Sequence, residues 1–128
     1  MSNYYVVTCG NIGLVYEGPS KKKALAVFRE YSNLSLSYVG KAAGEAVHLS
    51  TQEGEDLRAM VPTRWEVTDT FGGESNYSWV QRGATRTLAQ AKKAVRQFIP
   101  RARVTCDYGD QLELRHSRIC RVGFIYRF

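Results

Sequence analysis

The chain has 128 residues, of which 44% are hydrophobic, 12% aromatic and 23% charged, and its formal net charge is +6. This composition supports a core for one domain or for two small halves, which excludes a disordered chain. No apolar run approaches the roughly 20 residues of a membrane span, and the first residues lack a secretory signal, so we expect a soluble cytoplasmic protein without membrane contact.

Residues 1–61 carry the signals of strand, strand, helix, strand and strand in that order. The expected strands are 4–9, 12–17, 45–50 and 57–61, with a helix over 21–32 and a loop over 33–44. Ser20 has the short hydroxyl side chain that favours a helix N-cap. Four apolar residues then repeat at the i, i+3, i+4, i+7 spacing of one helical face: Ala24, Val27, Phe28 and Tyr31.

Residues 62–128 repeat this order and add one strand. The expected strands are 65–70, 76–82, 103–107, 111–115 and 120–126. The helix between them begins after Thr87, which has the spacing of a capping box with Gln90, and it ends at Pro100. One face of this helix is apolar: Leu88, Ala91, Val95 and Phe98.

The element order predicts an α+β fold in which two helices pack on antiparallel sheets, because short turns between neighbouring strands favour antiparallel pairing. We expect the halves 1–61 and 62–128 to form one compact unit. Two explanations of the repeated order stay open. The halves are either a pseudo-duplicated pair of ββαββ units or a chance succession of common elements.

Charge and cation type both change between the halves. Residues 1–61 hold six basic and six acidic side chains, whereas residues 62–128 hold twelve and six, so the whole net charge lies in the second half. Four of the six cations in the first half are Lys, and ten of the twelve in the second are Arg. A guanidinium group is a planar fork of donors that matches phosphate or carboxylate, so we expect an anionic partner.

Arginines near turns and helix ends are the candidate anion-binding residues, together with two aromatic residues that offer rings for stacking on bases. The set is Arg82, Arg86, Arg96, Arg101, Arg103, Arg115, Arg118, Arg121, Tyr77 and Trp79. The alternative is a solvated basic surface with the aromatic rings in the core.

The sequence contains no catalytic motif with distinctive spacing, such as His-Glu-x-x-His, Gly-x-Ser-x-Gly or a phosphate loop. Carboxylates flank the glycines of two turns, an arrangement that suits Mg²⁺ in a nuclease but is also ordinary turn chemistry. These pairs are Asp69 with Glu74 and Asp107 with Asp110. The three cysteines include no Cys-x-x-Cys pair and predict buried free thiols. We therefore expect no enzyme, no cofactor and no metal site.

Two segments carry a resemblance to a known group of proteins. One is 68–80, Thr-Asp-Thr-Phe-Gly-Gly-Glu-Ser-Asn-Tyr-Ser-Trp-Val, and the other combines 15–18 with 40–45. Both are similar to segments of small, uncharacterised accessory proteins of bacteriophages and prophages. The resemblance implies a counter-defence protein of the host bacterial cytoplasm, which binds and blocks a nucleic-acid-handling or defence complex as an anti-CRISPR protein does. The alternative is a direct binder of nucleic acid or of a signalling nucleotide.

Overall fold

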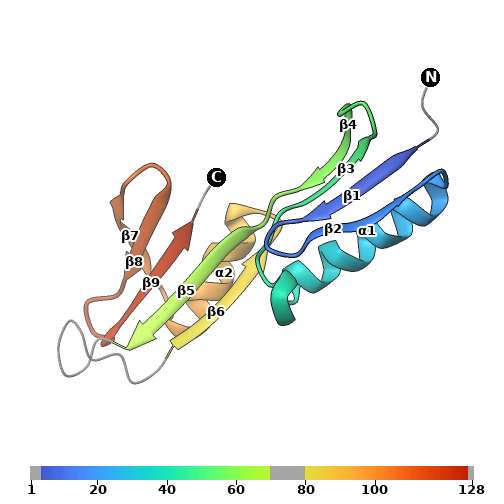
Figure 1. Cartoon of the computed structure of the whole chain (residues 1–128). Helices are drawn as coiled ribbons and strands as arrows, with labels where there is room; N and C mark the ends of the chain where they lie inside the picture. The colour runs from blue at the N-terminus through green and yellow to red at the C-terminus, as the bar shows by residue number, and fades with distance from the viewer. Residues whose placement is uncertain (1–3, 70–79, 127–128) are drawn as a thin grey trace. The chain divides into compact units, whose positions relative to one another are not determined.

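The computed structural model describes residues 4–69 and 80–126. It contains two antiparallel sheets and two helices, which confirms the predicted α+β fold (Figure 1). The chain divides into two compact units, Met1–Pro62 and Thr63–Phe128, and each unit buries its own hydrophobic cluster. Within the described ranges, no helix is both long enough and apolar enough to cross a membrane.

The first unit is a four-stranded sheet with one long helix. Its elements are β1 (Tyr5–Cys9), β2 (Gly13–Gly18), α1 (Lys21–Leu36), a 3₁₀ turn (Gly40–Ala42), β3 (Val47–Thr51) and β4 (Asp56–Met60). The strand order is β2-β1-β3-β4, and every pair is antiparallel. The helix begins where it was predicted, because the hydroxyl of Ser20 accepts a hydrogen bond from the amide of Lys23 at 3.1 Å.

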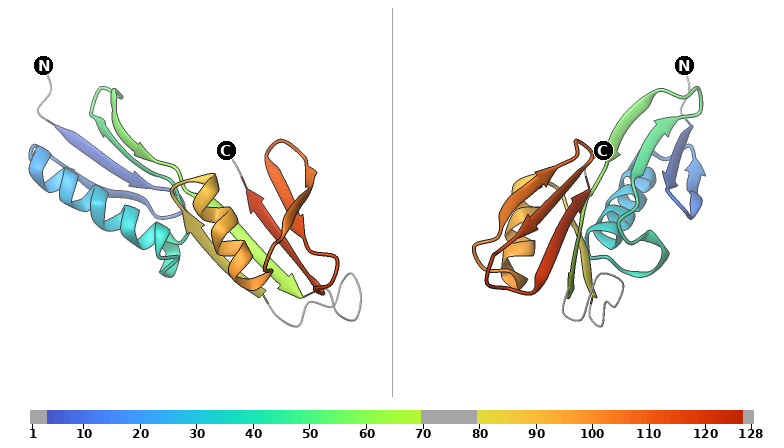
Figure 2. Two further views of the ribbon diagram at one scale, coloured as in Figure 1. Left: turned by 180° about the vertical axis from the view of Figure 1, so that it is seen from behind. Right: turned by 90° about the vertical axis from the view of Figure 1, so that its left-hand side faces the viewer.

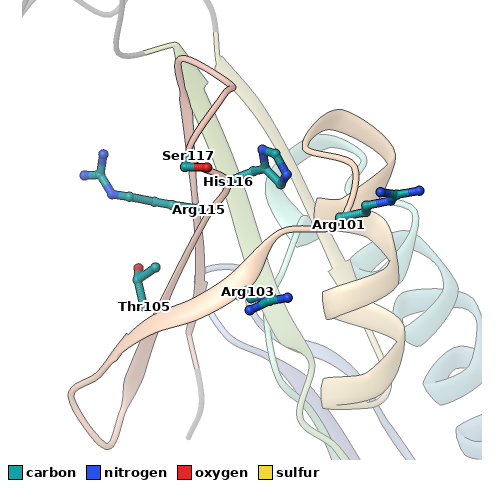
Figure 3. A pocket seen from close by; sticks show the side chains of 6 residues that line it. All are labelled: Arg101, Arg103, Thr105, Arg115, His116 and Ser117. Carbon is teal, nitrogen blue, oxygen red and sulfur yellow. The ribbon is translucent and has the colours of Figure 1, made fainter.

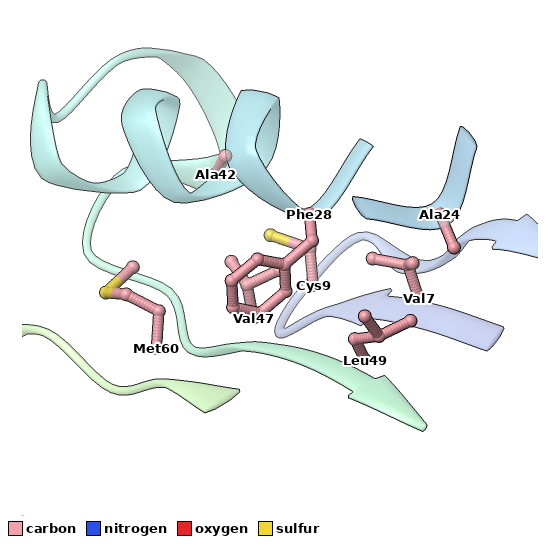
Figure 4. Packing of buried hydrophobic residues seen from close by; sticks show 8 residues of the cluster. All are labelled: Val7, Cys9, Ala24, Phe28, Ala42, Val47, Leu49 and Met60. Atoms are coloured by element: carbon pink, nitrogen blue, oxygen red, sulfur yellow. The ribbon is translucent and has the colours of Figure 1, made fainter. Parts of the chain in front are cut away.

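The core of the first unit lies between α1 and the sheet. Alternate residues of the two central strands are buried, including Val7 of β1 and Leu49 of β3, because successive strand residues face opposite sides. Ala24 and Phe28 of α1 pack onto them (Figure 4). The predicted apolar face of the helix is therefore correct in its centre, and Tyr31 lies half-buried at its margin.

Helix α1 is one turn longer than predicted, so the expected end at Ser32 was wrong. The buried face continues through Ser32 and Ser35, and a search for apolar spacing misses such small polar residues. The hydroxyl of Ser35 donates to the carbonyl of Glu45 at 2.6 Å, which satisfies this buried group. Beyond Leu36 the chain closes the helix in a Schellman arrangement, in which the amide of Tyr38, with φ of 57°, donates to the Ser35 carbonyl at 3.1 Å.

The second unit is a five-stranded sheet with one helix. Its elements are β5 (Thr63–Asp69), β6 (Val80–Thr85), α2 (Leu88–Phe98), β7 (Arg103–Asp107), β8 (Gln111–Arg115) and β9 (Arg121–Tyr126). The strand order is β6-β5-β9-β8-β7, again antiparallel throughout. Helix α2 lies on one face of this sheet, in front of the strands in Figure 2 (left) and behind them in Figure 1.

The ββαββ order occurs in both units, but the sheet topologies differ. In the first unit the strand that follows the helix, β3, pairs with β1 at the centre of the sheet. In the second unit the first strand, β5, pairs instead with the last strand, β9. The strand that follows the helix, β7, lies at the edge of the sheet. The additional strand thus changes the arrangement and leaves β7 with one exposed edge.

Two glycines let α2 and Trp65 approach the sheet of the second unit. A Cβ atom at Gly123 would lie 2.5 Å from a methyl group of Val95, and one at Gly83 would lie 2.5 Å from the indole ring of Trp65. The indole ring packs in turn against Phe98, with the ring centroids 5.8 Å apart. The helix is therefore fixed close to one face of the sheet, and the site described below lies at the edge formed by β7 and β8.

Candidate functional site

An open pocket of about 490 Å³ lies at the edge of the second unit (Figure 3). It is lined by Arg101, Arg103, Thr105, Arg115, His116 and Ser117. These residues come from the segment before β7, from β7 itself, from the end of β8 and from the loop that follows β8. Each lining side chain carries a hydrogen-bond donor, three of them are guanidinium groups, and none of the six is a carboxylate, so the pocket suits an anion.

Antiparallel pairing of β7 and β8 brings two of the arginines together. Arg103 lies directly opposite Arg115, and like charges in such a cross-strand pair are unfavourable without a counter-charge. In Figure 3 the guanidinium group of Arg115 extends to the opposite side from that of Arg101. The arginines are therefore distributed along the pocket, which suits a ligand with more than one anionic group.

A bulge shapes the wall of the pocket on β7. The register shifts between Val104 and Cys106, so Thr105 is the extra residue of that strand. The hydroxyl of Thr105 lies 3.1 Å from the carboxylate of Glu113. The same carboxylate accepts a hydrogen bond from Nε of Arg115 at 2.8 Å, which uses one of the five N–H groups of that guanidinium. Glu113 thus orients Arg115 and leaves most of its donors for a ligand.

Arg101 adopts a backbone conformation that favours glycine. It occupies the third position of a turn closed by the amide of Ala102, which donates to the carbonyl of Ile99 at 3.1 Å. Pro100 takes the second position, and φ of Arg101 is 61°, the combination typical of a type II turn. A side chain in the left-handed region costs about 1–2 kcal/mol, and strained residues of this kind are often found at ligand sites.

Exchanging Arg101 for glycine is therefore expected to separate stability from binding. Arg101→Gly should raise the free energy of unfolding by up to about 1 kcal/mol, because the relief of strain exceeds the added flexibility of the unfolded chain. Because the pocket suits an anion, the same exchange should weaken binding of an anionic probe such as inorganic pyrophosphate. Urea denaturation and calorimetric titration measure the two quantities. Lower stability together with unchanged pyrophosphate binding would contradict the role given to this residue.

The loop between β8 and β9 fixes the orientation of His116. Its Nδ1 accepts a hydrogen bond from the amide of Arg118 at 3.1 Å, and its carbonyl accepts one from the amide of Ile119 at 3.1 Å. A neutral imidazole whose Nδ1 accepts carries its proton on Nε2, so the ring offers a donor on its other side. The sequence contains only two histidines, and nothing in the spacing of His116 indicated a place in a pocket.

The other predicted arginines lie outside the pocket. Arg82 pairs with Glu66 across β6 and β5 at 2.6 Å. Arg86 is exposed just before α2, and Arg118 is exposed in the loop beside the pocket, where only its amide contacts His116. The two predicted aromatic residues, Tyr77 and Trp79, lie outside the described residues.

Two further predicted arginines bind carbonyl groups near the end of α2. Nε of Arg96 donates to the carbonyl of Ala102 at 3.0 Å, and Nη1 of Arg121 donates to the carbonyl of Phe98 at 2.8 Å. The last carbonyls of a helix have no hydrogen-bond partner within the helix. Arg121 supplies a donor to one of them, and Arg96 supplies a donor to a carbonyl in the segment just after the helix. In the described structure, both guanidinium groups take part in holding the fold.

Removing one of these helix-end bonds is expected to affect stability alone. Arg121→Ala should lower the free energy of unfolding by about 1.5–3 kcal/mol, because it deletes a hydrogen bond from a charged donor to a part-buried carbonyl. Pyrophosphate affinity should stay within about twofold of the wild type. Denaturant titration and calorimetry check the two parts, and a loss of affinity without a loss of stability would place Arg121 in the binding site.

One of the carboxylates proposed as a metal alternative, Asp107, has a structural role in a turn. Oδ1 of Asp107 accepts a hydrogen bond from the amide of Gly109 at 2.8 Å, the pattern of an Asx turn. Across residues 4–69 and 80–126, no three His, Cys, Asp or Glu side chains lie close enough together to hold a metal ion. Glu74 lies outside these ranges.

The three cysteines differ in exposure, and the pKa values of one cysteine and one tyrosine are raised. Cys9 is buried in β1, and burial, aided by the charge of Glu45, raises the pKa of its thiol. The prediction of three buried thiols was wrong for the others, because Cys106 is half-buried and Cys120 is exposed just before β9 begins. A side-chain hydrogen bond to Cys106 raises the pKa of the exposed Tyr108.

Comparisons of the chain with protein-family models, with curated proteins and with solved structures find no match. The similarity to bacteriophage accessory proteins therefore stays a prediction from two short segments. The function must be inferred from the pocket and from the charge of the unit that contains it.

Proposed function

We propose that the protein is a non-enzymatic binding protein whose second unit holds phosphate groups of a nucleotide or nucleic acid. The observation that carries the proposal is the pocket with three arginines, one histidine and two hydroxyl groups as its lining. Guanidinium groups bind phosphate through paired, charge-assisted hydrogen bonds. The excess of twelve cations over six anions in residues 62–128 attracts polyanions to this unit.

The pocket favours the direct-binding alternative over the blocking of a protein complex, which was the first expectation from the sequence. Distributed arginines suit the repeated charges of a phosphodiester or polyphosphate. In a counter-defence protein of a bacteriophage, the same activity would withhold nucleic acid or a signalling nucleotide from a host defence complex in the cytoplasm. This role rests on the resemblance in two segments, whereas phosphate binding rests on the pocket itself.

The pocket supports binding more than catalysis. Covalent catalysis needs a nucleophile activated by a neighbouring base. Within the described residues, His116 is not hydrogen-bonded to the hydroxyl of Thr105 or of Ser117, and its Nδ1 is taken by the loop backbone. We therefore expect nucleic acid and nucleotides to leave the pocket chemically unchanged.

The test is direct binding of defined anions by the purified protein. A fluorescein-labelled single strand of about eight nucleotides and inorganic pyrophosphate should both bind at low salt. The logarithm of the affinity for the strand should fall linearly with the logarithm of salt concentration between about 50 and 200 mM. Incubation with Mg²⁺ should release no cleavage product. Failure of both probes to bind at low salt, or turnover of the strand, would refute the proposed function.

A further inference from the structure

The second face of the five-stranded sheet carries an ordered pattern of side chains. Helix α2 covers the face that buries Val67, Leu114 and Ile125. Neighbouring residues in a strand point to opposite sides, so Glu66, Glu113 and Phe124 belong to the other face. Among the described residues of the unit, no helix or second layer of strands lies on that face, which Figure 1 presents to the viewer.

One row of this face crosses all five strands. The register places Arg82, Glu66, Phe124, Glu113 and Cys106 side by side in the order β6-β5-β9-β8-β7. The next row toward the pocket ends in Arg115 and Arg103, which line the pocket. Thr68 and Val122 of the same row are buried, so the face and the pocket are joined at Glu113 and Arg115 of β8.

Two aromatic rings lie on the central strand of this face. Phe124 and Tyr126 alternate on β9 and both are partly exposed, although residues in the middle of a sheet have neighbours on each side. The guanidinium group of Arg64 lies over the Tyr126 ring, with its carbon 5.7 Å from the ring centroid. Arg115 is the diagonal neighbour of Phe124, and partly exposed rings near arginines are a usual surface for stacking single-stranded bases.

Two carboxylates, those of Glu66 and Glu113, make the middle of this face acidic, whereas its pocket end is basic. Glu66 and Glu113 flank Phe124 on either side. Glu66 is bonded at 2.6 Å to Arg82 on the strand farther from the ring, and Glu113 is bonded at 2.8 Å to Arg115 of its own strand. Carboxylates repel phosphates, but they accept hydrogen bonds from the amino groups of bases. Phosphates are thus directed to the arginines of the pocket, and bases to the middle of the sheet.

We propose that this face binds a single-stranded nucleic acid, with its backbone in the pocket and successive bases on Phe124 and Tyr126. The proposal rests on the proposed function of the pocket and names the ligand. Phe124 is the diagonal neighbour of Arg115 across β9 and β8. The Cα atoms of such neighbours lie roughly 7–8 Å apart, a distance that one nucleotide spans. A mononucleotide has one base and can stack on only one of the two rings. In a duplex the faces of the bases are covered by neighbouring bases. Two rings along one strand therefore favour a single-stranded nucleic acid over either of these ligands.

Substitution of the rings tests the ligand separately from the pocket. Phe124→Leu and Tyr126→Leu should each lower the affinity for a labelled single strand of about eight nucleotides by about 5- to 100-fold. Affinity for inorganic pyrophosphate should not change, because it has no base. Phe124→Tyr keeps an aromatic ring and should keep the affinity, and Tyr31→Leu in the first unit is the matched control. The same sequence as a duplex should bind more weakly than the strand.

The outcomes distinguish the two proposals. Full strand affinity in both leucine variants, or equal affinity for duplex and strand, overturns the ligand assignment, while the pocket retains its role if pyrophosphate binds. Absence of binding by either probe overturns both. Should a leucine variant fail to fold, ring-proton shifts of Phe124 and Tyr126 in the wild type decide the matter. Addition of the strand should shift both signals, pyrophosphate should shift neither, and unchanged signals with bound strand refute the stacking.

Discussion

Replacing Arg101, Arg103 and Arg115 together by alanine is expected to lower the affinity for a single strand by about 1,000-fold or more, since each charge-assisted hydrogen bond contributes about 1.5–3 kcal/mol. The salt dependence should change as well. Each phosphate contact on a single strand adds about 0.7 to the slope of log affinity against log salt, so three lost contacts should reduce the slope by about two units. Fluorescence anisotropy over a salt series measures both quantities.

The matched control removes three positive charges from the other unit. Lys21, Lys22 and Lys23 are exposed in the first turn of α1, where cations interact unfavourably with the helix dipole. Their replacement by alanine should leave the affinity and the salt slope close to those of the wild type. Equal losses in the lysine and arginine variants would indicate a response to total charge, without a defined site.

Phe28→Ala is expected to destabilise the protein by about 3–5 kcal/mol, because the lost ring leaves a cavity between α1 and the sheet. Phe28 is 8% exposed and packs among Val7, Val47 and Met60 (Figure 4). A unit of about 60 residues is only marginally stable, so this loss amounts to most of its stability. The prediction is tested by thermal unfolding followed by circular dichroism.

The control for this prediction is Val39→Ala, which shortens a side chain that is 50% exposed. It should change the free energy of unfolding by less than about 0.5 kcal/mol. An unchanged melting temperature in Phe28→Ala, or equal effects of the two substitutions, would show that the helix does not pack as described.

Local signals account for the parts of the fold that were predicted correctly. Strands β7 and β8 have the predicted bounds, because a turn with Asp and Gly separates two runs of alternating character. The cap of α2 was also correct in part, since the hydroxyl of Thr87 accepts from the amide of Gln90 at 3.2 Å. The side chain of Gln90, however, reaches the amide of Arg86 at 3.2 Å, one residue earlier than in a standard capping box.

The order of strands and the composition of the pocket depend on contacts that local patterns do not contain. The pairing of β9 with β5 joins segments more than 50 residues apart, and no nearby residue specifies it. Arg101 reaches the pocket only through a turn with positive φ, whereas Arg96 and Arg121, of the same residue type, bind carbonyls near α2. Sequence reasoning located the basic unit, and three-dimensional pairing determined which arginines are available.

The most direct test of phosphate binding by this pocket is the NMR signal of each arginine Nε–H group during titration with a single strand. The signals of Arg101, Arg103 and Arg115 should shift together and saturate at one common affinity. Those of Arg96 and Arg121, which are bonded to carbonyls of the fold, should not move. Shifts confined to arginines outside the pocket, or small linear shifts of every arginine without saturation, would contradict the account.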